Sequence, residues 1–143
     1  MTPEEQDEAL EALYRLVPDI PGCKGLCHNS CTAIEMSARE RDRLTEAGVT
    51  LTPHDVAARK LQETGVAHRC EALDADNRCT IYDKRPMVCR LFGTTQTHVG
   101  EGMGFLNCEF GCAPEPPLTE QQAFELLHGS MQVGGLPRGW TFR

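Results

Sequence analysis

The stretch CTIYDKRPMVCRLFG occupies residues 79–93. Its first four residues predict a short extended piece, and the Arg85-Pro86 step then favours the start of a short helix that runs through Phe92. Two cysteines, Cys79 and Cys89, fall on these two short elements. The stretch therefore predicts small irregular elements held together by cysteines, rather than a long helix or a sheet.

Upstream of this stretch, two segments carry helical signals. Residues 3–17 combine acidic residues in the first turn with an apolar stripe at helical spacing, which favours a first helix. Ser37 and Glu40 form a capping box that begins a second helix, and Gly48 is a suitable end for it. The stripe on the first helix consists of Leu10, Leu13, Tyr14 and Val17.

Two further helices are expected on either side of residues 79–93. Thr52 is a candidate cap with Pro53 at the first helical position, and Gly65 ends that helix. Thr119 is a candidate cap for a last helix, after which Gly134-Gly135 begins a loose tail. One face of the third helix is predicted from Val56, Ala57, Lys60 and Leu61, and the last helix contains Phe124, Leu126 and Leu127.

The remaining segments predict irregular chain. Residues 70–82 contain Asp74-Ala75-Asp76-Asn77, which is typical of a turn, and the glycines of residues 93–107 predict a long loop. Such long segments in a compact domain are usually functional or tied down. We therefore expect a mostly α fold: a small, metal-stabilised single domain over residues 1–143, with long irregular loops, little or no sheet, and a cysteine-cluster region at 20–112.

Composition narrows the function. The chain has 143 residues, 40% hydrophobic and 24% charged, which is typical of a globular domain rather than a disordered chain. Its formal net charge of -7 argues against a nucleic-acid partner. No apolar stretch is long enough to span a membrane. The acidic N-terminus lacks the features of a signal peptide, so we expect a cytoplasmic protein.

The eight cysteines are the main candidates for chemistry. In a reducing cytosol, cysteines are more often metal ligands or redox groups than structural disulfides. The pattern therefore predicts a metal ion or cluster as the partner, and leaves any protein partner undefined. They form three groups along the chain: Cys23, Cys27 and Cys31; Cys70, Cys79 and Cys89; Cys108 and Cys112.

The first group tests how the ligands can be arranged. On one straight helix, Cys23 and Cys31 would lie about 12 Å apart along the axis, whereas thiolates around one zinc lie within roughly 4 Å of each other. Three cysteines on one zinc therefore require a loop, which Pro21, Gly22 and Gly25 favour. Two four-cysteine zinc sites, one iron–sulfur cluster with spare thiols, and one site beside catalytic thiols all remain compatible with the spacing.

Other residues give weaker signals. The most economical interpretation of His28, His68 and His98 is as polar loop residues, and of His54 as an exposed residue. Arg85 and Arg90 flank Cys89, where a cation offsets thiolate charge; pairing with a nearby carboxylate is the alternative.

No catalytic triad, paired-carboxylate site or phosphate loop stands out. We therefore expect a metal-binding protein rather than an enzyme. The alternatives are an iron–sulfur redox protein or enzyme component, and a zinc-stabilised interaction module with a basic patch at Arg39, Arg41 and Arg43.

Residues 20–93 resemble the YkgJ-like cysteine-cluster proteins, which are also described as zinc- or iron-chelating domains. The most specific part is C-x-I-Y-x-x-R-P-x-x-C-R-x-F, which begins at Cys79. The resemblance implies binding of zinc, iron or an iron–sulfur cluster. A related cysteine pattern in flagellin lysine methylases is ascribed to an iron–sulfur cluster.

The chain departs from the family pattern at one position. The family carries two adjacent cysteines at the end of the first cluster, whereas here Cys31 is followed by Thr32. The resemblance therefore leaves one ligand missing, and Cys108 or Cys112 is the candidate to replace it.

Overall fold

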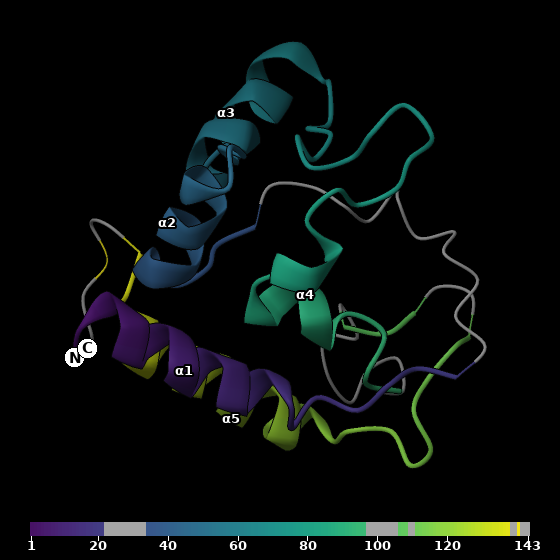
Figure 1. Cartoon of the computed structure of the whole chain (residues 1–143). Coiled ribbons are helices and arrows are strands. Elements are labelled where there is room, and N and C mark those ends of the chain that lie inside the picture. The colour runs from purple at the N-terminus through teal and green to yellow at the C-terminus, as the bar shows by residue number, and fades with distance from the viewer. Residues whose placement is uncertain (22–33, 97–105, 109–110, 138–139, 141–143) are drawn as a thin grey trace.

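The computed structural model describes residues 1–21, 34–96, 106–108, 111–137 and 140 (Figure 1). Within these residues the regular structure is helical, and strand-like pairing is limited to isolated bridges. The prediction of a mostly α fold is confirmed. None of the described helices combines the length and apolar character needed to cross a lipid bilayer. The elements are α1 (Pro3–Tyr14), α2 (Ala38–Glu46), α3 (His54–Thr64), the 3₁₀ turn η2 (Tyr82–Lys84), α4 (Met87–Leu91) and α5 (Glu120–Gly134).

Local capping sequences begin three of the helices. Thr2, Ser37 and Thr119 each accept a hydrogen bond from the backbone amide three residues on, at the N-termini of α1, α2 and α5. In each case the side chain at that third position accepts a hydrogen bond from the cap residue's amide in return. These reciprocal pairs satisfy amides that the helix itself leaves without partners. The predicted caps at Ser37 and Thr119 are confirmed.

The main hydrophobic cluster lies where α1, α4 and α5 meet. α1 and α5 run side by side along one edge of the molecule (Figure 1). Leu13, Val17, Leu126 and Leu127 pack against the cluster from its margin, so the predicted stripe on the first helix faces the core as expected. The buried members are Leu10, Tyr14, Met87, Leu91, Leu106 and Ala123.

A second, smaller cluster lies between α2 and the irregular segment that follows α3. Its buried residues come from both sides of that junction, and the side chains of Cys70 and Cys79 pack against it. Two of the candidate ligands are therefore supported by their own apolar cluster. The buried members are Met36, Leu44, Leu51, Ala72 and Ile81.

The first helix is shorter than the predicted range of 3–17. α1 ends at Tyr14, and the next residues continue in a tighter turn in which Leu16 donates to the Leu13 carbonyl (3.0 Å) and Val17 to the Tyr14 carbonyl (3.1 Å). These bonds span three residues instead of four. Pro18 has no amide with which to continue the helix.

The third helix differs from the prediction at its start. Pro53 is its N-cap, and no side chain caps the helix. Thr52 is engaged elsewhere, because its amide (2.7 Å) and its hydroxyl (3.1 Å) both donate to the carboxylate of Glu71. The predicted cap at Thr52 is therefore wrong, while the predicted end at Gly65 is confirmed by its left-handed φ of 70°.

The predicted face of the third helix is also not a buried face. Ala57 is buried, but Val56 is 44% exposed, Leu61 is 48% exposed, and Lys60 is exposed as well. α3 extends away from the α1–α5 pair (Figure 1) and makes no extensive contact with another described helix. These four residues were predicted to share one face of the helix, and the rest of the described fold does not cover that face.

Candidate metal centre

Cys70 and Cys79 lie on two chain segments that backbone hydrogen bonds join. The amide of Thr80 donates to the carbonyl of Ala72 (2.8 Å), and an isolated antiparallel bridge pairs Leu73 with Cys79. Both cysteines are half-buried. The two thiols are thus held against one apolar cluster by a small paired element.

A polar turn closes this element. The Asp74 carboxylate accepts from the amides of Asp76 (2.8 Å) and Arg78 (3.0 Å), and Asn77 takes a left-handed φ of 62°. Arg69 donates to the carbonyl of Asp74 (2.8 Å) and to the side chain of Asn77 (2.9 Å). The turn predicted from these residue types is confirmed, and it fixes the separation of the segments that carry the two cysteines.

Burial and negative charge on Cys79 both disfavour ionisation of the Cys70 thiol. Burial raises the pKa of Cys70 above its usual value, a hydrogen bond from the Ala72 amide opposes that rise, and negative charge on Cys79 adds to it. Two thiolates close enough to repel each other are a favourable place for a divalent cation, because the cation offsets both charges.

Cys108 packs close to Gly93, just after the helix that carries Cys89. A β-carbon at Gly93 would lie 3.6 Å from Cβ of Cys108 and 3.1 Å from Cδ1 of Ile20. Cys89 is on α4, one helical turn earlier, and its carbonyl accepts from the amide of Phe92 (3.4 Å). Gly93 has a φ of 85°, which lets the chain leave α4 and pass close to Cys108.

A backbone hydrogen bond links the two ends of the Cys108-x3-Cys112 step. The amide of Gly111 donates to the carbonyl of Cys108 (3.1 Å), and Cys112 is the next residue. The backbone that leads into Cys112 is therefore close to that of Cys108, which is compatible with two ligands to one metal.

The described residues supply pairs of thiols but no complete ligand set. Among them, no group of three or more histidine, cysteine, aspartate or glutamate side chains is close enough to hold one metal ion. Cys23, Cys27 and Cys31 lie outside the described residues. Half-buried thiol pairs suit zinc and iron–sulfur chemistry, in which thiolate sulfur is the preferred donor. The donor set therefore fits such a group.

The predicted histidines separate into two sets. His54 is exposed as expected, and its amide donates to Glu35 (2.8 Å). The His68 ring forms a short hydrogen bond with Glu71. Burial would raise the pKa of Glu71, but the hydrogen bonds from His68 and Thr52 outweigh burial and leave it below its usual value. The predictions for His28 and His98 concern residues outside the described part of the chain.

The two arginines beside Cys89 lie over aromatic rings. The guanidinium of Arg85 is 3.8 Å from the ring centre of Tyr82, and that of Arg90 is 3.9 Å from the ring centre of Tyr14. Arg90 also donates to the carbonyls of Arg85 (2.6 Å) and Asp83 (2.9 Å). The carbonyl bonds show that Arg90 fixes the turn before α4, a structural role that neither sequence-based interpretation included.

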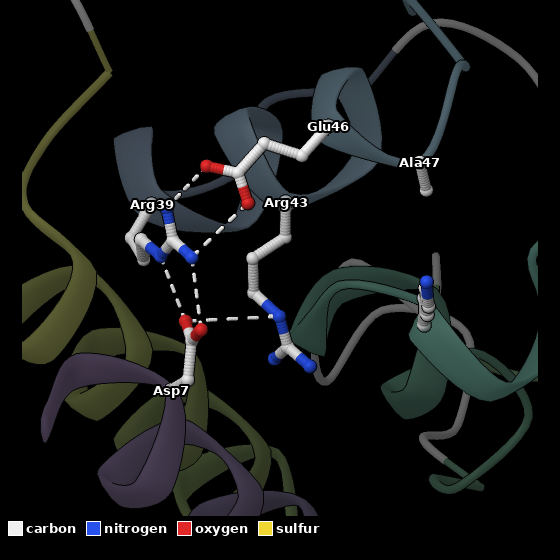
Figure 2. Close-up of a pocket in the computed structure, with 6 residues that line it drawn as sticks. Asp7, Arg39, Arg43, Glu46 and Ala47 are labelled. Carbon is white, nitrogen blue, oxygen red and sulfur yellow. Dashed lines mark hydrogen bonds and ion pairs between the residues drawn. The ribbon is translucent and has the colours of Figure 1, made fainter. Parts of the chain in front are cut away.

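The predicted basic patch is neutralised by carboxylates. Arg39 donates to Asp7 (2.7 Å) and Glu46 (2.9 Å), as Figure 2 shows for the shallow pocket between α1 and α2. Arg43 donates to Glu11 (2.8 Å). Arg41 lies 3.7 Å from Glu35. The hydrogen bond from Arg39 is the main cause that lowers the pKa of Asp7. The patch predicted from Arg39, Arg41 and Arg43 is therefore not a free cationic surface.

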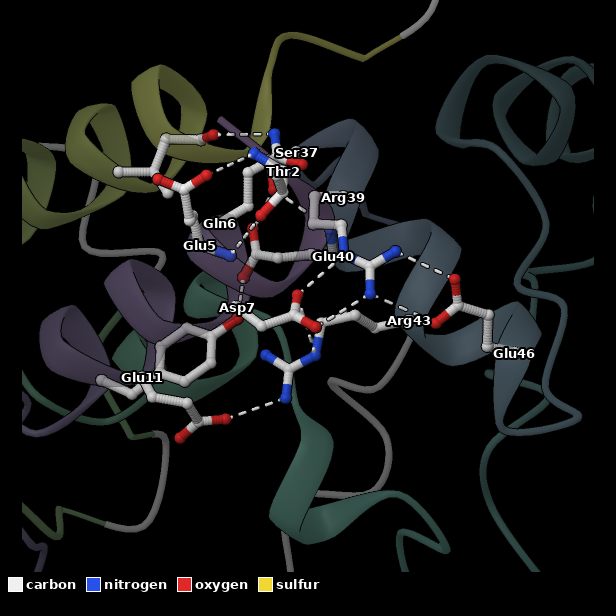
Figure 3. A network of polar contacts seen from close by, with 12 residues as sticks. Thr2, Glu5, Gln6, Asp7, Glu11, Ser37, Arg39, Glu40, Arg43 and Glu46 are labelled. Carbon is white, nitrogen blue, oxygen red and sulfur yellow. Dashed lines mark hydrogen bonds and ion pairs between the residues drawn. The ribbon is translucent and has the colours of Figure 1, made fainter.

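The buried carboxylate of Glu40 joins α1, α2 and α4, and the sequence-based prediction covered only part of its role. Glu40 was expected as the capping partner of Ser37, and it does accept from the Ser37 hydroxyl (2.7 Å). Its carboxylate, which Figure 3 shows beside Ser37, also accepts from the Tyr14 hydroxyl and from the Met87 amide, both at 2.6 Å. The sequence signal that could have indicated this wider role is Tyr14, because a tyrosine on a core-facing stripe generally needs a partner for its hydroxyl.

Comparison with known proteins supports a cysteine-based site. A family model with the description "CxxCxxCC: Putative zinc- or iron-chelating domain" matches residues 22–113. That range contains all eight cysteines. No curated protein and no solved structure matches the chain.

Proposed function

Because the chain belongs to the CxxCxxCC family of zinc- or iron-chelating domains, we propose that it is a cytoplasmic protein whose cysteine thiolates hold zinc or an iron–sulfur cluster. The whole chain, residues 1–143, is taken as a single metal-binding domain with its ligands in 20–112. The proposed ligands are Cys23, Cys27, Cys31, Cys70, Cys79, Cys89, Cys108 and Cys112.

The observation that carries the proposal is the placement of Cys70 and Cys79. Two half-buried thiols on paired segments are electrostatically coupled, and each added negative charge makes the next harder to form. A bound metal supplies the positive charge that lets both remain deprotonated. Without it, burial keeps the Cys70 thiol protonated beside the apolar cluster.

The ligands fall into two neighbourhoods. Cys70 and Cys79 are supported by the second apolar cluster. The other described cysteines are Cys89 on α4, Cys108 close to Gly93 at the exit of α4, and Cys112, which follows the Gly111 amide that donates to Cys108. We propose that these two neighbourhoods provide ligands to different metal positions, and that the N-terminal cysteines complete them.

Metal binding would also stabilise the irregular segments. Residues 70–81 contain no helix or extended strand, and their order depends on the Asp74 turn and the isolated bridge. Structural metal binding is generally coupled to folding, because the unfolded chain has no preformed site. In this role the chain's thiolates bind and orient, and no residue is assigned a catalytic function.

Anaerobic purification followed by zinc, iron and acid-labile sulfide analysis tests the proposal. A colourless protein with about two zinc ions per chain supports two four-cysteine sites. Iron with matching sulfide and a brown colour supports a cluster. A folded protein that retains neither metal, and that takes up neither when it is reconstituted, contradicts the proposal.

Serine substitutions test the two neighbourhoods. If Cys70 and Cys79 serve one position, the double variant Cys70→Ser/Cys79→Ser loses no more metal than either single variant. The combination Cys79→Ser/Cys108→Ser should then lose the metal of both positions. His54→Asn is the matched control, since this histidine is exposed and distant from both pairs in the chain. Equal loss in the two double variants would contradict the division.

A further inference from the structure

The carboxylate of Glu40 is buried and accepts four hydrogen bonds. Its side chain belongs to a residue that is 2% exposed. One oxygen, Oε1, accepts from the amide (3.3 Å) and the hydroxyl (2.7 Å) of Ser37. The other, Oε2, accepts from the hydroxyl of Tyr14 and the amide of Met87, both at 2.6 Å. Three separate elements, α1, α2 and α4, thus meet at one side chain.

The bond to Met87 is the one that concerns the metal site. Met87 is the first residue of α4, and no side chain at the N-terminus of α4 caps the helix. Glu40 supplies the acceptor from 47 positions earlier in the sequence. α4 spans only Met87–Leu91. A helix this short is not stable alone, so its placement depends on such outside contacts.

α4 carries Cys89 in its middle. Its flanking residues Met87 and Leu91 are completely buried in the main cluster, which limits how α4 can shift along its axis. The carboxylate of Glu40 fixes the remaining end. Together these contacts decide where the Cys89 sulfur is presented.

We infer that Glu40 is a positioning residue for the metal site: its carboxylate holds the N-terminus of α4 and so sets the place of Cys89. This inference rests on the proposed function, because it assumes that Cys89 is a ligand. It predicts that a change at Glu40 weakens metal binding although Glu40 is not itself a ligand.

Glu40→Met is the most informative substitution, because it keeps the length of the side chain and removes both carboxylate oxygens. A thioether sulfur is only a weak acceptor, so the Met87 amide loses the acceptor that Glu40 supplies. Glu40→Gln would not serve, because its amide oxygen can still accept from Met87 and Tyr14 while its NH₂ group donates to the Ser37 hydroxyl. The matched control is Ser37→Ala, which removes a donor to the same carboxylate on the side away from α4.

The experiment titrates the metal-free, full-length chain with Co²⁺ under anaerobic conditions and follows thiolate-to-cobalt absorption. We expect Glu40→Met to lose about tenfold or more in Co²⁺ affinity and to change the spectrum, as changes in supporting residues around metal sites commonly do. Ser37→Ala should retain wild-type affinity and spectrum, even where its thermal stability falls. Equal effects of the two variants, or no effect of Glu40→Met, would overturn the inference while leaving the proposed function intact.

Failure of the proposed function gives a different result. Wild-type protein that binds no Co²⁺ would overturn both statements at once. If Glu40→Met does not fold, hydrogen exchange in the wild type provides the test. Co²⁺ should slow exchange of the Met87 amide relative to the Arg41 amide, and Cys89→Ser should abolish that difference. The same slowing in Cys89→Ser as in the wild type would overturn the inference.

Discussion

The hydroxyl of Tyr14 donates a 2.6 Å hydrogen bond to the carboxylate of Glu40, across 26 positions of sequence. The ring of the same tyrosine lies under the guanidinium of Arg90, 3.9 Å from its centre. One side chain on α1 therefore contacts the carboxylate that holds the start of α4 and the arginine that follows Cys89. Tyr14 is therefore expected to contribute both to the stability of the fold and to the placement of Cys89, a candidate ligand.

Tyr14→Phe is expected to lower the free energy of unfolding by about 1–3 kcal/mol. The substitution keeps the ring beneath Arg90 but deprives a buried carboxylate of one of its donors, and an unsatisfied buried acceptor is costly. Denaturant unfolding of the metal-free protein measures the loss. Tyr82→Phe is the control, because Tyr82 is 60% exposed and should change little. Equal stability of Tyr14→Phe and wild type would show that this hydrogen bond contributes nothing.

Alkaline pH should destabilise the protein through the same residue. Burial, together with the charge and hydrogen bond of Glu40, raises the pKa of Tyr14 well above its usual value. An unfolded tyrosine titrates near about 10. Below that pH, Tyr14 is protonated in both the folded and the unfolded protein, and its contribution to the free energy of unfolding is fully present. Above it the unfolded state loses the proton first, so the free energy of unfolding falls with rising pH.

This pH dependence is measured as the difference in free energy of unfolding between the wild type and Tyr14→Phe. Above pH 10 the wild type should lose up to about 1.4 kcal/mol per pH unit more than Tyr14→Phe. Cysteines and lysines titrate in both proteins, so their contributions largely cancel. Parallel stability curves for the two proteins would contradict the assignment to Tyr14.

Two glycines of α5 should respond oppositely to alanine. A β-carbon at Gly134 would lie 2.2 Å from Oγ and 2.6 Å from Cβ of Ser37, the cap of α2. At Gly129 the nearest atom is Cδ1 of Leu13, at an ordinary 3.5 Å. Gly134→Ala should therefore lower the thermal unfolding temperature, whereas Gly129→Ala should raise it, with a helix-propensity gain of up to about 1 kcal/mol. A rise in both variants would show that the α5–α2 contact relaxes without cost.

The parts of the fold that follow from the sequence are those fixed by near neighbours. The caps at Ser37 and Thr119 form as predicted because both partners lie within three residues. Thr52 failed as a cap because Glu71, nineteen positions away, accepts both of its donors. Helical spacing places Val56 on one face of the third helix, but nothing in that local pattern says whether another element lies against it.

At the candidate site too, local sequence signals could be predicted and contacts between distant positions could not. The cysteines predicted a metal-binding domain, and the family model confirms that kind of domain. The bond between Glu40 and Met87 could not be predicted, because it joins positions 47 residues apart and requires α2 to meet the start of α4. Arg90 was expected either to offset charge on Cys89 or to pair with a nearby carboxylate, and its visible contacts are with Tyr14 and two backbone carbonyls.

Gly93→Ala should weaken metal binding more than its backbone strain alone explains. Gly93 and Gly48 have similar left-handed φ values, 85° and 90°. At Gly48 a β-carbon would meet nothing within 4 Å, so Gly48→Ala measures the strain of that conformation. At Gly93 the added atom would press on Ile20 at 3.1 Å and contact Cys108 at 3.6 Å.

The two alanine variants should therefore lose similar stability from the backbone, on the order of 1 kcal/mol each. Only Gly93→Ala should displace the chain around Cys108 and Cys89, and it should lower Co²⁺ affinity measured by competition with a chelator. Co²⁺ affinity that falls equally in both variants would show that Gly93 acts through general stability. Affinity unchanged in Gly93→Ala would place Cys108 outside the metal site.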